Sequence, residues 1–535
     1  MGRYCERDAD QSPARKSCVI CGSLNDEQRS MNRLSRSLIT DDRSLLRCFQ
    51  WALFFVGCVL FHVIGTWSLP LIDRDEPRFA EASREMIQRG DYVVPYFNNQ
   101  VRLDKPPLTY WAQVTSYRIF GENDFAARFP SVVAAALIAV SIPVRGLRIG
   151  GERLGWQAAI IFTLCLQTFI HAKAAVADMW LALFVSIAFW SGLELLRDGL
   201  TNAQHQKSTI NHQTPHWWLV FYISLALGFL AKGPIAWTPL LTVACTIFYA
   251  PNLQLRRRFK FVRGILLMLA IIATWGIPAL IRTHGEFLKI GIGRHVIARS
   301  LGAMEGHGWD SLGGYVLLLP FYFVTLFVSF FPWSIKLPSL LKRLWRKRDN
   351  IDNYLLSGAA IIFIIFSLIK TKLPHYTLPA FGLLALLLAR HWEEDRGIAN
   401  RLSLFKTIAI ATACGWIAIA SIIPPMVARF FPAYQLFHQS RAVLQPNMQF
   451  AAVDFEEPSL VWYFRSHVKG FLTPLNKRRA AEFTSAPGPR FVVLPTPVAG
   501  SVFVNPPQNW QFFTTSGLNI AKGKRVDLTL VLKPE

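Results

Sequence analysis

The segment Ile72–Met86 places a carboxylate and a guanidinium group one helical turn apart, at Asp75 and Arg78. A carboxylate can take a proton from an attacking hydroxyl group, and an arginine can bind two oxygens of one phosphate. Six further charged residues lie in the same segment: Asp73, Arg74, Glu76, Glu81, Arg84 and Glu85. Because the segment directly follows an apolar stretch, two interpretations stay open. It is either an active site at a membrane surface or a solvated helix start that anchors a loop.

Other groups capable of chemistry lie at the ends of later apolar stretches. Ionisable groups are costly inside a membrane and commonly mark functional sites there. These candidates are Asp178, Lys232, Lys372, His375 and Tyr376, together with the segment Arg282–Asp310. Each type also has an ordinary structural explanation. An aspartate can cap a helix, a lysine can anchor a span at the interface, and a tyrosine can belong to an aromatic belt.

The composition predicts which elements position these groups. Of the 535 residues, 52% are hydrophobic and 17% are charged, and the mean hydropathy is +0.29, which is too apolar for a soluble protein of this length. A transmembrane helix needs roughly 20 mostly apolar residues, and such windows recur about eleven times. They are Leu46–Ile64, Ala126–Pro143, Trp156–His171, Met179–Leu196, Trp217–Ala231, Ile235–Ala250, Ile265–Ile281, Leu312–Pro332, Leu355–Leu368, Leu373–Leu388 and Phe405–Val427. The sequence therefore predicts an all-α polytopic membrane protein.

The net charge of +23 is explained by topology rather than by nucleic-acid binding. Basic residues follow the second, sixth and eighth windows, within 145–153, 256–263 and 342–348. Positively charged loops stay in the cytoplasm, so these loops and the basic N-terminal segment should be cytoplasmic. An odd number of spans then puts the C-terminus outside. On this topology the candidate groups of five separate loops gather at the outer face.

Three regions follow from the same pattern. Residues 1–45 are polar and are predicted to form a disordered cytoplasmic segment. Residues 46–428 should form the membrane domain. Residues 429–535 alternate short β-type runs with Pro, Gly and Asn, which predicts a small α/β domain outside the membrane. We expect this domain to contact an acceptor or to serve as a scaffold.

The segment Ile72–Met86 itself is expected to form a helix. Pro77 suits its first turn, Asp75 or Glu76 is a candidate N-cap, and Gly90 suits its end. One face is apolar and the opposite face is charged, as in a helix that lies in the membrane interface. Its N-terminus would offer free N–H groups to an anion beside Arg78.

The motifs DEPRFAEASREM, RGDYVVPYFNN, LDKPPLTYW, ADMWLALF, FLAKGPIA, GRHVIARSLGAMEGHG, FFPWSIKLP and TKLPHYTLPAF follow one another along the chain. In this order they resemble the bacterial aminoarabinose transferase and protein mannosyltransferase-like family of membrane glycosyltransferases. The resemblance implies a GT-C fold with helices in the first external loop. It also implies an inverting enzyme of the bacterial inner membrane, with its site on the outer side. The donor would be a polyprenyl-phosphate sugar, and the acceptor lipid A, another cell-envelope glycan or a protein.

The resemblance also implies roles for single residues. Asp75 matches the proposed base and Asp178 a second carboxylate, whereas Arg78, Lys105 and Arg299 match the positions that hold the donor phosphate. Further substrate contacts are expected from Glu76, Lys232, Lys372 and Tyr376. Some relatives use a divalent metal, and the matching positions here are Asp104 and His295. The family usually has Glu where this chain has Asp104, which puts metal use in doubt.

Two other classes of function remain as alternatives. A multi-span transporter would also hold ionisable groups, but the sequence has no inverted repeat and its charges concentrate at one face rather than at mid-span. An inactive membrane scaffold is the second alternative. The combination of Asp75, Arg78 and Lys105 argues against it.

Overall fold

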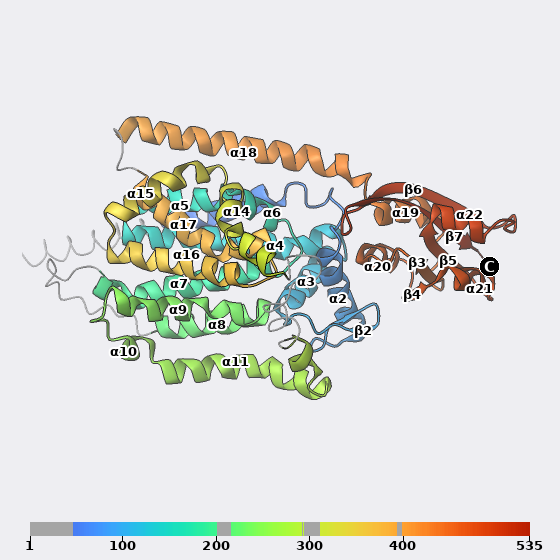
Figure 1. Ribbon diagram of the computed structural model, residues 1–535, viewed down its shortest axis with the longest axis horizontal. Coiled ribbons are helices and arrows are strands. Elements are labelled where there is room, and N and C mark those ends of the chain that lie inside the picture. Colours follow the sequence, from blue (N-terminus) through green and yellow to red (C-terminus); the bar gives the residue numbers. More distant parts are fainter. Residues whose placement is uncertain (1–45, 201–215, 292, 294–310, 393–397, 535) are drawn as a thin grey trace, which may run out of the picture. The chain divides into compact units, whose positions relative to one another are not determined.

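The structure is a computed structural model that describes residues 46–534, apart from 201–215, 292, 294–310 and 393–397. The chain divides into a short unit, 1–57, and a large unit, 58–535, and each is considered by itself. In the short unit, the described residues are helical and begin the helix Leu46–Val63. The large unit holds all the other elements (Figure 1).

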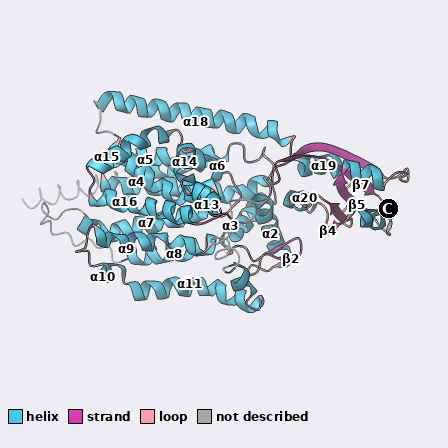
Figure 2. Ribbon diagram, in the orientation of Figure 1, coloured by secondary structure: helices cyan, strands magenta, loops and turns pink. Residues whose placement is uncertain are grey.

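Six helices in the described part of the chain are long and apolar enough to cross a membrane. They are Leu46–Val63, Asp124–Ile149, Asp178–Arg197, Leu255–Arg282, Asn350–Leu368 and Ser403–Ala428. The pair Gly313–Ser329 and Trp333–Arg346, bent by 113°, is a candidate seventh span. The protein is therefore a mostly helical, multi-pass membrane protein (Figure 2).

The remaining expected windows form shorter or interrupted helices. The window Trp156–His171 breaks at Cys165, whose ψ of 136° is not helical, into α5 (Glu152–Leu164) and α6 (Leu166–His171). Prolines interrupt others, because proline cannot donate a backbone hydrogen bond to the preceding turn. The prolines concerned are Pro234 and Pro239, at the starts of η1 and α9, and Pro374, at the start of η5. The count of eleven spans stays a prediction, since length and composition alone support six or seven.

The helices of the membrane region have these bounds: α4 Asp124–Ile149, α7 Asp178–Leu200, α8 Trp217–Lys232, η1 Pro234–Trp237, α9 Thr238–Cys245, η2 Thr246–Phe248, α10 Leu255–Phe259, α11 Phe261–Arg282, α13 Leu312–Leu317, α14 Phe321–Ser329, η4 Trp333–Lys336, α15 Leu337–Arg346, α16 Asn350–Leu368, η5 Pro374–Ala380, α17 Phe381–His391 and α18 Ile398–Ala428. Helices α4, α5, α7, α8 and α16 pack alongside one another (Figure 1). Small residues allow this packing. A Cβ atom on Gly146 of α4 would lie only 2.2 Å from the Cα of Gly155 in α5.

The first external loop contains α2 (Asp75–Arg89), the short strands β1 (Tyr96–Phe97) and β2 (Gln100–Val101), and α3 (Leu108–Phe120). Gly90 ends α2 with φ +65°, as predicted. The N-cap prediction is wrong, because Arg74 occupies that position without a side-chain cap and Asp75 and Glu76 lie in the first turn. A solvated charged face, one of the two interpretations left open, is not found. Both faces of α2 are buried, the apolar one against α3 and the charged one against the C-terminal region.

The C-terminal region is a mixed five-stranded sheet with helices on both faces, which agrees with the expected small α/β domain. Its elements are α19 Pro432–Ser440, η6 Arg441–Val443, β3 Gln449–Val453, α20 Pro458–Phe464, β4 Leu472–Leu475, α21 Lys477–Ser485, β5 Arg490–Pro495, α22 Thr496–Val502, β6 Gln511–Asn519 and β7 Lys524–Lys533. The strand order is β4-β3-β5-β7-β6. Strand β3 pairs in parallel with β4 and β5, whereas β7 pairs antiparallel with β5 and β6.

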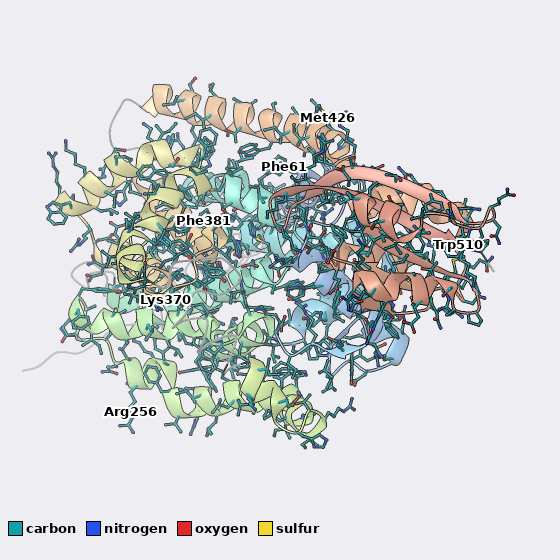
Figure 3. The ribbon with its side chains drawn as sticks, turned by 45° about the vertical axis from the view of Figure 1, so that its right-hand side comes forward. Phe61, Arg256, Lys370, Phe381, Met426 and Trp510 are labelled. Carbon is teal, nitrogen blue, oxygen red and sulfur yellow. The ribbon has the colours of Figure 1, made fainter. Side chains whose placement is uncertain are left out.

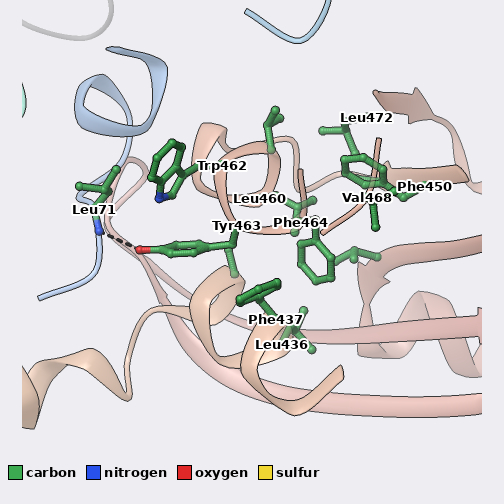
Figure 4. Packing of buried hydrophobic residues seen from close by; sticks show 14 of the residues in the cluster. Leu71, Leu436, Phe437, Phe450, Leu460, Trp462, Tyr463, Phe464, Val468 and Leu472 are labelled. Atoms are coloured by element: carbon green, nitrogen blue, oxygen red, sulfur yellow. Dashed lines mark hydrogen bonds between the residues drawn. The ribbon is translucent and has the colours of Figure 1, made fainter. Parts of the chain in front are cut away.

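Alternate residues of the strands bury the two faces separately, as the two-residue period of a strand requires. Phe450 and Ala452 of β3 pack with α19 and α20, whereas Ala451 and Val453 pack with α21 and α22. The α20 side continues into the membrane region. Its core includes Leu71, whose backbone N–H donates to the Tyr463 hydroxyl at 2.9 Å (Figure 4).

Candidate active site

A cavity of about 710 Å³ lies among α8, η1, α9, α11 and α16. Most of its wall is apolar, with side chains such as Trp237, Leu241, Trp275, Ile365 and Phe366. The ionisable groups on its lining come from three separate segments of the chain: Asp104 with Lys105, then Lys232, and then Tyr376. Such a cavity suits a ligand that has a long apolar part and an anionic head. Of the residues predicted to converge on one face, Lys232 and Tyr376 line this cavity, whereas Asp75 and Arg78 are not among its lining residues.

Lys232 stands at the last position of α8, where Gly233 turns the chain with φ +86°. Its Nζ lies 2.5 Å from Oδ1 of Asp178, the first residue of α7, and 4.9 Å from the ring centre of Tyr376. Asp178 is buried, so this is a largely desolvated ion pair. Losing one partner of such a pair leaves an uncompensated charge, at a cost of about 3–5 kcal/mol.

A series of polar side chains extends from this ion pair through His375 and His171 to Gln167 and Ser329. His375 Nε2 lies 3.7 Å from Asp178 Oδ1, and the His375 ring packs on that of His171 with 4.7 Å between centres. His171 Nδ1 is 2.8 Å from Gln167 Nε2, and Ser329 donates to Gln167 Oε1 at 3.0 Å. The sequence analysis missed Gln167 and His171. Their polarity at the end of the otherwise apolar window Trp156–His171 was the available signal.

Asp75 and Arg78 lie in the first turn of α2, where Asp75 is exposed and Arg78 is half-buried. Neither forms an ion pair with another residue in the part of the chain that the structure describes. Asp75 is electrostatically close to Arg102. Burial lowers the pKa of Arg102, but Tyr110, Asp104 and Asp75 outweigh burial and raise it. An exposed carboxylate without a fixed partner is available to a substrate.

Glu76, in contrast, is held by structural contacts. It is 5% exposed, and its two carboxylate oxygens accept hydrogen bonds from Arg128 of α4 at 3.0 and 2.7 Å. It also accepts from the backbone N–H groups of Ile72 and Ala175. These bonds use the carboxylate to fix the start of α2 against α4. The prediction that Glu76 binds substrate finds no support in this geometry.

Lys372 also has a structural position. Its side chain is buried, and Nζ donates to the backbone oxygens of Phe366 at 3.1 Å and Ser367 at 2.5 Å. These are carbonyl groups at the C-terminal end of α16, which a cation stabilises. Lys370, labelled in Figure 3, is half-buried just beyond the same helix end. Lys372 is not among the residues that line the cavity, so its predicted substrate contact has no support.

The structure does not test the expected pair of metal ligands, Asp104 and His295. His295, like the phosphate candidate Arg299, lies outside the described residues. The Asp104 carboxylate lies 3.4 Å from the Arg102 guanidinium, a neighbour that disfavours a cation. Among the described residues there is no group of three His, Cys, Asp or Glu that could hold a metal ion. Metal use therefore stays a prediction.

The charges in the second half of the segment Ile72–Met86 contact α20 and the residues around it. Arg84 donates to Glu81 at 2.6 Å and to the backbone oxygen of Trp462 at 2.9 Å. Arg465 pairs with Glu81 and lies 3.2 Å from Glu85. Burial raises the pKa of Glu81, and the two arginines oppose this effect. These charges serve the interface between α2 and the C-terminal region, which sequence analysis missed.

Asp73 makes a second connection of this kind, two residues before Asp75. Its carboxylate accepts from the backbone N–H of Ser459 at 2.8 Å and from the Ser459 hydroxyl at 2.5 Å. Burial raises the pKa of Asp73 to about 7, although the bonds from Ser459 work in the opposite direction. The C-terminal region thus contacts the chain both before α2, at Asp73, and within α2, at Glu81 and Arg84.

A family profile described as dolichyl-phosphate-mannose-protein mannosyltransferase matches residues 104–277. The chain is 32% identical over 379 residues to undecaprenyl phosphate-alpha-4-amino-4-deoxy-L-arabinose arabinosyl transferase 2 of Sodalis glossinidius, covering 68% of this chain and 64% of that protein. It is 29% identical over 384 residues to the corresponding transferase of Erwinia tasmaniensis, covering 69% of this chain and 64% of the relative. The matched region thus spans less than two thirds of either relative.

The fold also matches a solved structure. The crystal structure of ArnT from Cupriavidus metallidurans bound to undecaprenyl phosphate superposes with a TM-score of 0.71 at 16% identity, covering 90% of this chain and 98% of that one. At this identity the likeness shows a shared fold. It extends over the membrane helices and the C-terminal region together, since so much of both chains is covered.

Proposed function

Since this chain belongs to the aminoarabinose transferase and protein mannosyltransferase-like family of GT-C membrane glycosyltransferases, we propose that it transfers a sugar from a polyprenyl-phosphate donor to an acceptor outside the cytoplasm. The names of the relatives make undecaprenyl phosphate the first candidate carrier and 4-amino-4-deoxy-L-arabinose the first candidate sugar. Lipid A is the first candidate acceptor, and other glycans and proteins are the alternatives.

The observation that carries this proposal is the cavity of about 710 Å³ with apolar walls and two lysines on its lining. The apolar side chains suit the first isoprene units of the lipid. Lys105 and Lys232 can neutralise its phosphate, and Tyr376 lies beside Lys232. A soluble nucleotide sugar is polar and would leave most of this apolar wall without a matching contact. A transporter would need ionisable groups along the spans, whereas these groups lie at helix ends.

The proposed reaction is a direct displacement at the anomeric carbon. The acceptor oxygen forms a bond to that carbon while the bond between the carbon and the phosphate oxygen breaks. The acceptor proton passes to the Asp75 carboxylate, and the polyprenyl phosphate leaves with the bonding electrons. Arg78 and Lys105 are placed in this scheme to stabilise the negative charge that grows on the phosphate.

Asp75 is a better candidate for the base than Asp178 because of their surroundings. Asp178 is buried and paired with Lys232 at 2.5 Å, so its protonation would break a desolvated ion pair. Asp75 is exposed and has no ion pair with a described residue. We therefore assign Asp178 to the orientation of Lys232, which in turn contacts the phosphate.

The membrane arrangement belongs to the same proposal. The protein would reside in the bacterial inner membrane with the cavity and the C-terminal region on the periplasmic side, where lipid-linked sugars are used. The domain bounds 46–428 and 429–535 fit the end of α18 at Ala428 and the start of α19 at Pro432. Residues 1–45 would lie in the cytoplasm.

Reconstitution tests the function directly. The purified full chain in liposomes would receive undecaprenyl phosphate-linked 4-amino-4-deoxy-L-arabinose and lipid A, and the lipids would be analysed by mass spectrometry. We expect lipid A to gain one aminopentose and the free carrier phosphate to appear in equal amount. An Asp75→Asn protein is the matched control. The assay would be repeated with envelope glycan and protein fractions in place of lipid A, and if the wild-type protein modifies none of these acceptors, the proposal is wrong.

A further inference from the structure

A second cavity, of about 380 Å³, lies in the C-terminal region and does not belong to the site described above. Two of its walls are the carboxyl ends of β3 and β5, at Asp454, directly after β3, and at Pro495, the last residue of β5. The third wall is the hairpin between β6 and β7, with Lys522, Lys524 and Arg525. The cavity therefore opens at the carboxyl ends of two neighbouring parallel strands.

This position is a topological switch point of the sheet. After β3 the chain continues to α20, which packs on one face, and after β5 it continues to α22, which packs on the other face. Two adjacent parallel strands whose connections leave to opposite faces create a crevice between their ends. In open α/β sheets, ligands commonly bind in such a crevice.

The lining of the cavity combines cations with hydroxyl acceptors. Lys522, Lys524 and Arg525 are all exposed and can bind an anion, whereas Asp454 and Asp527 can accept hydrogen bonds from sugar hydroxyls. Asp454 has φ +59°, a left-handed conformation that is uncommon outside glycine and that recurs at binding sites. A ligand with both phosphate or carboxylate groups and hydroxyl groups satisfies this lining.

Glu457 connects the cavity with the first external loop. It is buried, and its Oε1 accepts a hydrogen bond from Asn519 at 2.9 Å and lies 3.9 Å from Lys522, both on the cavity wall. Its Oε2 lies 4.0 Å from Arg74, the residue directly before Asp75. One carboxylate thus joins the cavity wall to the start of α2.

We propose that this cavity binds the anionic saccharide head of the acceptor and delivers it to the first external loop. The identification of the ligand as the acceptor rests on the proposed glycosyl transfer. The cavity itself takes a saccharide that bears phosphate or carboxylate groups. Lys524 and Arg525 bind its anionic group, and Asp454 faces its hydroxyls. Glu457 fixes the position of the cavity wall relative to Arg74, and therefore relative to the neighbouring Asp75, the proposed base.

A binding measurement tests the cavity without requiring turnover. Glucosamine 1-phosphate, glucosamine and inorganic phosphate would be titrated by saturation-transfer NMR into the full chain in detergent. The double variant Lys524→Ala/Arg525→Ala should bind glucosamine 1-phosphate roughly tenfold more weakly or worse, because two charge-assisted contacts are lost. The control Lys477→Ala/Arg478→Ala removes the same charge from the exposed surface of α21 and should bind like the wild type. Equal binding by both variants would overturn the proposal. Inorganic phosphate competing as well as the sugar phosphate would overturn the saccharide assignment.

A transfer measurement tests the identification as an acceptor site. In the liposome assay, Lys524→Ala/Arg525→Ala should raise the acceptor KM roughly tenfold while the donor KM and kcat stay within about twofold. An unchanged acceptor KM in an active enzyme would overturn the acceptor assignment. If the wild-type protein transfers no sugar but still binds the probe through Lys524 and Arg525, the proposed function fails and the saccharide site stands.

Discussion

At the residue scale, the proposed chemistry depends on whether a carboxylate of the first external loop or that of Asp178 is free to take a proton. Glu76, Glu81 and Asp178 each have a guanidinium or ammonium group within hydrogen-bonding reach, and each is buried. Asp75 differs because it is exposed and has no such partner among the described residues. A base must exchange protons with substrate, so the absence of a fixed counter-ion is what singles out Asp75.

Replacing Asp75 by Asn should therefore abolish most of the transfer. Asn keeps the size of the side chain but cannot accept the acceptor proton, and loss of a general base typically lowers the rate roughly 10²–10⁴-fold. Initial rates in the liposome assay measure this. Stability should barely change, because Asp75 makes no side-chain cap bond in the structure. Near-normal transfer by Asp75→Asn would remove the base assignment.

The donor phosphate gives the second residue-scale prediction. Lys105→Ala should raise the donor KM, because a desolvated phosphate loses one of its cations, at a cost of about 2–5 kcal/mol. Lys372→Ala is the matched control, since that lysine binds carbonyl groups of α16 and does not line the cavity. It should lower stability with little effect on the donor KM. Identical donor KM values for wild type and Lys105→Ala would take Lys105 out of the phosphate site.

At the scale of elements, the position of α2 depends on α20. The charged face of α2 is buried against Arg465 and the backbone of Trp462, through contacts that follow the turn carrying Asp75 along the same helix. A helix whose charges are satisfied by another element cannot keep its place without that element. On the proposed mechanism, the C-terminal region is therefore part of the catalytic architecture, in addition to any role in binding an acceptor.

Arg465→Ala should destabilise this contact strongly. It leaves Glu81 and Glu85 buried beside fewer cations, and breaking one partner out of such a network costs about 3–5 kcal/mol. Thermal unfolding of the detergent-solubilised protein would measure the loss. Arg441→Ala is the control, because this arginine is exposed and, in the described part of the chain, its side chain bonds to His467 at 3.2 Å. Equal melting temperatures for the two variants would show that the buried charges do not hold α2.

The contact between Asp73 and Ser459 should depend on pH. Burial raises the pKa of Asp73 from 3.8 to about 7, so between these values the folded protein binds a proton that the unfolded chain releases. The contribution to stability is therefore largest below pH 4 and is lost as the pH rises to about 7. Asp73→Asn removes this titration, and it should raise the melting temperature at pH 8 more than at pH 5. The same shift at both pH values would contradict the assignment.

At the scale of the whole molecule, the sequence predicted the class of fold and the convergence of Asp178, Lys232, His375 and Tyr376, because helix ends on one side of a membrane must meet at one surface. It did not predict the partners of buried charges. Glu76 finds Arg128 on another helix, and Arg465 meets Glu81 across 384 positions of the chain. Such pairs depend on tertiary packing, which no local periodicity reveals. The sequence likewise made Lys372 a candidate phosphate ligand, because it does not reveal that the side chain binds the carbonyl groups at the end of α16.

The last prediction concerns the membrane topology, which decides whether the cavity and the C-terminal region lie on the side of the membrane opposite to the basic loops. Basic residues cluster after α10 and at the end of α15, where Lys342, Arg343 and Arg346 lie, and such clusters remain in the cytoplasm. A reporter fused after Arg348 should therefore be cytoplasmic, whereas one fused after Glu535 should lie outside, on the side of the lipid-linked donor. Alkaline phosphatase, which is active only outside, and a green fluorescent protein, which is fluorescent only inside, measure the two positions independently. Finding both fusions on the same side of the membrane would mean that the span count is even between them. The C-terminal region that holds α2 would then share a compartment with the basic loops, and an active site facing the periplasm could not be maintained.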